Sequence, residues 1–94
     1  MLKAKFVLPQ AGYFRDQDVA STFLIEGWTY EVDRVVMSQS HTSIWLKGYP
    51  VPFNSVQFEF YKDGEKHDIY NDPEYNPYIG FKVPSARRDN EVSE

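Results

Sequence analysis

Alternating apolar and polar positions dominate the chain and predict short extended strands rather than helices. A first strand is expected at residues 2–8, where every second position is apolar: Leu2, Ala4, Phe6 and Leu8. Proline and glycine at residues 9–12 predict a turn. The weaker pattern of residues 13–24 favours a loop with some helix, and a short helix is expected near residues 14–22.

A longer strand is predicted after Gly27, where Trp28, Tyr30 and Val32 alternate with polar residues. Residues 35–37 are then consecutively apolar, so the alternation slips by one position. A β-bulge near Arg34 explains the slip, because a bulge inserts one unpaired residue and bends the strand. Residues 38–41 read as a polar turn.

A third strand is predicted at residues 42–46, with Ile44 and Leu46 on the core face and Trp45 on the opposite face. Residues 47–52 cannot form a central strand, because each proline there lacks a donor for the ladder. The next strand is predicted from an apolar face of Val56, Phe58 and Phe60, with Gln57 on the polar face.

A hairpin is predicted at Asp63 and Gly64, because this pair suits the positive φ angles of a type I′ turn. The returning strand should occupy residues 66–70, followed by a turn-rich segment at residues 71–78 and a final edge strand at residues 79–83. The sequence thus predicts an all-β domain of five to six short strands, an SH3-like barrel or β-roll first and an OB-like barrel second. The domain should span residues 1–83, with a flexible tail at residues 84–94.

The composition indicates a packed globular domain without disulfide bonds. Of 94 residues, 41% are hydrophobic and 17% aromatic, which excludes a disordered chain. The chain has no cysteine, which fits a reducing compartment, and no apolar run long enough to span a bilayer. We therefore expect a cytoplasmic protein.

Acidic residues are concentrated in one short stretch of the chain. The formal net charge is −4, and residues 59–76 contain six acids and two bases, which equals the whole imbalance. Acids and tyrosines in this stretch could dock on a basic protein surface, the carboxylates steering the approach and the tyrosines anchoring it. The candidate partner-binding residues are Glu59, Tyr61, Asp63, Glu65, Asp68, Tyr70, Asp72, Glu74 and Tyr75. A second interpretation stays open, in which these acids only solvate the hairpin and protect an edge strand.

An alternative site uses the aromatic residues Trp45 and Tyr49, which could stack nucleic-acid bases or hold a small ligand. In the opposite interpretation, Trp45 covers a second, minor core or the loop of residues 13–24. The negative charge makes nucleic acid an unlikely direct partner, since such binding depends on Lys and Arg.

Metal binding and catalysis have little support in the sequence. His67, Asp68, Asp72 and Glu74 offer ligand atoms, but their spacing matches no calcium loop. No nucleophile or phosphate-loop motif is present, and Ser40 beside His41 is better explained as turn chemistry. We therefore expect no enzyme activity, no cofactor and no metal.

Several segments carry a family resemblance, the most specific being Phe53-Asn54-Ser55-Val56 and Asn71-Asp72-Pro73. Over residues 10–80 the chain resembles small uncharacterised proteins encoded by phages and prophages of low-GC Gram-positive bacteria. The resemblance implies an accessory phage protein that binds host machinery. In its most concrete form, this is a stoichiometric inhibitor of a host defence nuclease, of the anti-CRISPR or anti-restriction type. The oligomeric state is left open.

Overall fold

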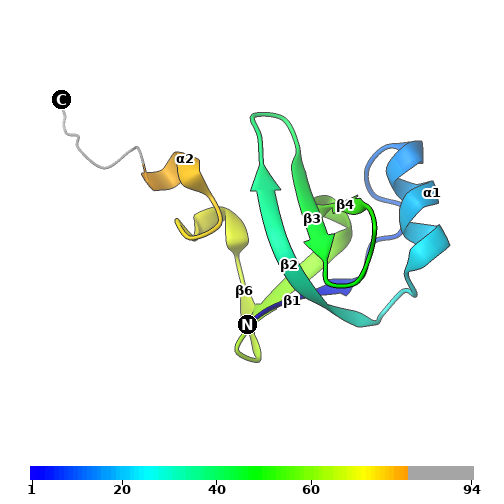
Figure 1. Ribbon diagram of the computed structural model, residues 1–94, viewed down its shortest axis with the longest axis horizontal. Helices are drawn as coiled ribbons and strands as arrows, with labels where there is room; N and C mark the ends of the chain where they lie inside the picture. The colour runs from blue at the N-terminus through cyan, green and yellow to red at the C-terminus, as the bar shows by residue number, and fades with distance from the viewer. Residues whose placement is uncertain (81–94) are drawn as a thin grey trace.

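A computed structural model describes residues 1–80 of the chain (Figure 1). Six antiparallel strands form one sheet in the order β4-β3-β2-β1-β5-β6. They are β1 (Leu2–Phe6), β2 (Thr29–Met37), β3 (Thr42–Leu46), β4 (Pro52–Asn54), β5 (Phe58–Lys62) and β6 (Glu65–His67). This arrangement confirms a small, mostly-β fold, and closure into an SH3-like barrel stays a prediction.

Strand β2 joins the two halves of the sheet. Its first residues pair with β1, and the residues from Val32 to Met37 pair with β3. The register shifts between Val32 and Arg34, which confirms the predicted bulge. Because a bulge bends its strand, β2 can serve two ladders that run in different directions.

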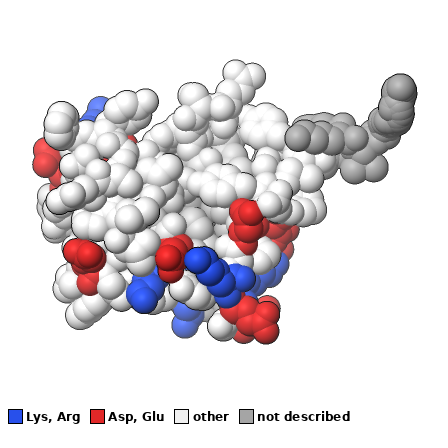
Figure 2. All heavy atoms as spheres, turned by 180° about the vertical axis from the view of Figure 1, so that it is seen from behind, with Lys and Arg blue, Asp and Glu red and all other residues white. Residues whose placement is uncertain are grey.

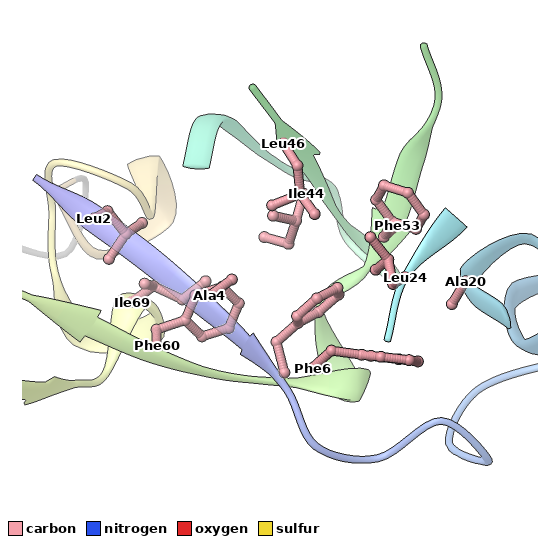
Figure 3. Close-up of a cluster of buried hydrophobic side chains, with 11 residues drawn as sticks. Leu2, Ala4, Phe6, Ala20, Leu24, Ile44, Leu46, Phe53, Phe60 and Ile69 are labelled. Carbon is pink, nitrogen blue, oxygen red and sulfur yellow. The ribbon is translucent and has the colours of Figure 1, made fainter. Parts of the chain in front are cut away.

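The core lies on one face of this bent sheet, where side chains from β1, β3, β4 and β5 meet (Figure 3). Phe6 and Phe58 pack with their ring centroids 5.6 Å apart, and Phe53 lies 6.3 Å from Phe58. Burial of each such side chain contributes about 1.5–3 kcal/mol. The predicted core alternation holds for Leu2, Ala4 and Phe6, but Leu8 lies beyond β1 and is exposed.

Residues 14–23 form a helix, α1 (Phe14–Phe23), which confirms the short helix expected near residues 14–22 and leaves less loop than expected over residues 13–24. The Asp16 carboxylate accepts a hydrogen bond from the Tyr13 amide at 3.0 Å, which satisfies one of the free donors of the first turn. Ala20 is fully buried, and the Phe23 ring packs edge-on against Phe53. The helix thus covers the β4 end of the core.

At the start of the segment before the hairpin, the buried and exposed positions are exchanged relative to the prediction. Asn54 begins a 3₁₀ turn, η1 (Ser55–Gln57), and β5 starts only at Phe58. As a result Val56 is exposed, whereas Gln57 is fully buried, opposite to the prediction. A 3₁₀ turn has three residues per turn, so it breaks the alternation of a strand.

The hairpin between β5 and β6 has the predicted type I′ turn, with φ of 53° at Asp63 and 87° at Gly64. Strand β6 is shorter than expected and leads into a second 3₁₀ turn, η2 (Ile69–Asn71), whose Ile69 is fully buried. A short helix, α2 (Pro77–Gly80), stands where the edge strand was expected to begin. The rest of that strand and the predicted tail lie outside the described residues.

Candidate functional site

Sheet pairing places the basic residues of β1 beside β5, whose one acid is Glu59. Lys5 lies opposite Glu59, and Lys3 lies opposite Tyr61. Tyr61 also pairs with Lys66 of β6. The stretch of residues 59–76 carries a net charge of −4, and Lys3 and Lys5 reduce the local charge to −2. Figure 2 shows charged side chains of both signs intermingled along the lower margin of the molecule.

Glu59 and Tyr61 form a polar pair on the outer face of β5. The Tyr61 hydroxyl donates to Glu59 Oε1 at 2.9 Å, and this hydrogen bond raises the pKa of Tyr61. Lys66 Nζ lies 3.9 Å from the other carboxylate oxygen of Glu59. Both predicted site residues are therefore engaged within the protein.

The tip of the hairpin holds two exposed acids, Asp63 and Glu65. Asp63 has a 77% exposed side chain and accepts the N-terminal ammonium at 2.9 Å, which lowers its pKa. Glu65 is exposed and pairs in register with Lys62. An exposed ion pair such as that of Asp63 adds little stability, so the Asp63 and Glu65 carboxylates remain available to a partner.

A second group of acids surrounds Lys62 on the opposite face of the hairpin. Lys62 Nζ lies 3.0 Å from Glu74 and 3.4 Å from Asp72, and the hydrogen bond with Glu74 is the main reason that the pKa of Lys62 is raised. The ammonium also lies 5.4 Å from the centre of the Tyr75 ring, within cation–π range.

Asp72 holds this group together. One oxygen accepts the Glu74 amide at 2.9 Å, and the other lies 2.7 Å from His67 Nε2. The amide hydrogen bond and the His67 contact, in that order, lower the pKa of Asp72. Asp72 therefore acts as a structural tie between β6 and the segment that follows.

Asp68 and Tyr70 belong to a fourth environment, the 3₁₀ turn η2 that follows β6. Asp68 caps η2 by accepting the Tyr70 amide at 3.0 Å, while the Tyr70 hydroxyl shares a 2.5 Å hydrogen bond with Ser55 Oγ. The nine predicted residues thus lie on the two faces of the hairpin, at its tip and at η2 rather than on one surface.

The alternative aromatic site is also divided. The Arg34 guanidinium lies 5.0 Å from the ring centre of the half-buried Trp45, on the outer face of β3. Tyr49 instead packs edge-on against Tyr30 and Phe53 on the core side. The two side chains therefore do not form one stacking platform.

Chemical machinery is sparse in the described part of the chain. Among residues 1–80, no three side chains of His, Cys, Asp or Glu converge as a metal site. The His41 carbonyl accepts both the amide and the hydroxyl of Ser38, at 2.9 and 2.8 Å. This is turn chemistry, as predicted for residues 38–41.

A groove of about 680 Å³, which the sequence pattern does not predict, is formed by segments far apart in the chain. Its walls come from the loop before α1, the β2–β3 turn, the β4–η1 junction and the segment after η2. In sequence these are residues 11–13, 37–42 and 54–56, together with Tyr70, Asn76 and Tyr78. None of these lining residues is Lys, Arg, Asp or Glu. We call this surface the neutral groove.

Hydrogen bonds hold the floor of the neutral groove in place. Asn54 and Ser55 are 7% and 3% exposed. Asn54 donates to Asp16 at 2.9 Å and accepts the Val56 amide at 3.2 Å. One signal in the sequence points here, because Phe53-Asn54-Ser55-Val56 is among the most specific segments of the family resemblance.

The fold and these surfaces define a small, mostly-β protein with a charged hairpin and a neutral groove. A family model described as "Bacteriophage T4 protein Y07B" matches residues 1–81, so the chain belongs to this family of phage proteins. Searches of curated proteins and of solved structures produced no match. Within residues 1–80, no helix is long and apolar enough to cross a membrane.

Proposed function

We propose that this phage protein is a non-enzymatic accessory protein that binds a host protein in the cytoplasm of the infected cell. The observation that supports it best is the set of exposed acids held on a rigid hairpin and turn, namely Asp63, Glu65, Asp68 and Glu74. Contacts within the protein hold Asp63, Asp68 and Glu74 in place, so little order has to be gained on binding. Neither a membrane nor a cofactor takes part.

The partner in this proposal has a basic surface. Exposed carboxylates accelerate association with such a surface and disfavour direct contact with nucleic acid. Enzymes that handle nucleic acids carry basic grooves, because phosphate neutralisation dominates their affinity. A host defence nuclease inhibited stoichiometrically, in a low-GC Gram-positive host, is the most concrete form of the proposal.

The test is capture of host proteins from a lysate by the full chain and by two matched variants. The first variant, Asp63→Asn with Glu65→Lys, changes the charge at the hairpin tip. The second, Asp18→Asn with Glu26→Lys, makes the same change at exposed acids elsewhere. Asparagine tolerates the positive φ at position 63.

We expect one host protein to bind the native chain and the second variant equally. Binding to the hairpin variant should fall at least tenfold, with association slowing as salt is added. Equal loss in both variants, or binding that is insensitive to salt, contradicts the role of the hairpin. The activity of the captured protein is then measured with and without this chain, which distinguishes an inhibitor from a passive binder.

A further inference from the structure

The neutral groove has the size of a specific binding site. Its volume of about 680 Å³ lies within the range typical of sites that enclose a small ligand or a few side chains. Three loops and the segment after η2 converge on it, and loops on a rigid sheet are where binding residues concentrate. The fixed positions of Asn54 and Ser55 give it a preformed floor.

The lack of charge in the neutral groove selects for an uncharged occupant. Lys, Arg, Asp and Glu make up 26% of the chain, yet none lines the groove. A charged group seated in it would find no Lys, Arg, Asp or Glu among the lining side chains to pair with. The groove therefore complements a neutral segment of a partner rather than a phosphate or a carboxylate.

Exposed aromatic and apolar side chains surround the groove. Tyr13 is 77% exposed, and Val56, Tyr70 and Tyr78 are between 43% and 47% exposed. Tyrosine, phenylalanine and methionine are enriched at the centres of protein interfaces, whereas charged residues are depleted there. Exposed serine and histidine at positions 40 and 41 add hydrogen-bonding groups of the kind that peptide backbones need.

We propose that the neutral groove anchors an uncharged peptide segment of the partner protein through an apolar or aromatic side chain. This inference rests on the proposed function, because it names the centre of an interface whose charged rim is the hairpin. Tyr70 contacts both an exposed acid and the groove, since its amide donates to Asp68 and its hydroxyl bonds Ser55 on the groove floor.

The experiment is a titration of the ¹⁵N-labelled full chain followed by NMR, with N-acetyl-phenylalanine methylamide as a neutral aromatic probe. Methyl glucoside and inorganic phosphate are titrated in parallel as polyhydroxyl and anionic probes. We expect saturable shifts at residues 38–42 and 54–56, with a dissociation constant on the order of 1 mM for so small a ligand.

Two variants with similar exposure provide the control. Val56 in the groove is 47% exposed, and Val36 on β2, outside the groove lining, is 45% exposed. Val56→Glu should weaken binding of the aromatic probe at least fivefold, and Val36→Glu should leave it unchanged. The hairpin variant Asp63→Asn with Glu65→Lys should also bind the probe normally, so the groove and the proposed function can fail separately.

Three results would overturn the inference. The first is the absence of saturable groove shifts up to about 20 mM probe. The second is a stronger response to glucoside or phosphate than to the aromatic probe. The third is a set of groove shifts that depend on protein concentration alone, because a second copy of the chain would then fill the groove.

Discussion

Asn54 links helix α1 to the sheet, and its removal should destabilise the whole fold. Its Nδ2 donates to Asp16 at 2.9 Å, and its Oδ1 accepts the Val56 amide at 3.2 Å. A hydrogen bond to a charged group contributes about 1.5–3 kcal/mol, and a capping side chain contributes about 0.5–2 kcal/mol. We expect Asn54→Ala to lower the free energy of unfolding by about 2–4 kcal/mol, or Tm by about 10–25 °C for a domain of this size.

The variant Asn54→Asp tests the charge at this junction with little change in shape. Its carboxylate can still accept the Val56 amide, but it faces the Asp16 carboxylate instead of donating to it. Two close carboxylates raise the pKa of one of them. A carboxyl whose folded pKa is raised destabilises the protein above that pKa, and the loss is relieved as pH falls through it.

Urea unfolding followed by tryptophan fluorescence at about pH 7 and about pH 4 measures this effect. The deficit of Asn54→Asp relative to the native chain should shrink at the lower pH. Adding Asp16→Asn should restore part of the stability at the higher pH, because one negative charge is removed from the pair. If Asn54→Asp were as stable as the native chain at both pH values, the link between α1 and the sheet would be refuted.

Three further changes probe other parts of the fold. Gly12→Ala should lower the free energy of unfolding by about 1–3 kcal/mol, because Gly12 has a φ of +84° and a Cβ there would lie 2.9 Å from Asp16 Oδ2. Thermal unfolding measures the loss, and an unchanged Tm would contradict it. Because Ile69 is fully buried, Ile69→Ala should lower the free energy of unfolding by about 2–4 kcal/mol and Ile69→Val by about 1 kcal/mol, as measured by urea unfolding. Equal effects would mean that the segment after β6 does not share the core. Because the pKa of Asp72 is lowered in the folded protein, its ionised carboxylate adds stability above the ordinary pKa of 3.8, and this stability is lost as pH falls through the folded pKa. Asp72→Asn should therefore flatten the acid limb of a plot of urea midpoint against pH. Identical limbs for the native chain and the variant would refute this.

Elements set by local patterns were predicted closely from the sequence. Strand β3 has the predicted bounds, because its alternation is flanked by a polar turn on one side and by prolines on the other. The Asp63–Gly64 turn and the bulge near Arg34 also depend only on neighbouring residues. In each case the local preference and the tertiary structure agree.

Errors arose where packing overrides the local pattern. Val56 and Gln57 were assigned to the wrong faces because η1 shifts the phase of the chain just before β5. A shift of one residue exchanges the two faces of a strand. Helix α1 was only partly anticipated, since Ala20 is its one buried residue and the helix gains its stability from contacts such as Phe23 with Phe53.

The candidate surfaces differ in how far a sequence can reveal them. Acid clustering is visible in the sequence, but the number of acids in a segment does not define an acidic surface, because β1 brings Lys3 and Lys5 alongside β5. Asp72 bonds His67 and the Glu74 amide, so reversing its charge would disturb the fold as well as any binding surface. A binding test therefore belongs at the exposed hairpin tip. The neutral groove shows the opposite case, because residues 11–13, 37–42 and 54–56 have no common pattern until the sheet and α1 bring them together. The proposed combination of a neutral centre and charged surroundings thus depends on where the fold places the two surfaces, which no local sequence pattern specifies.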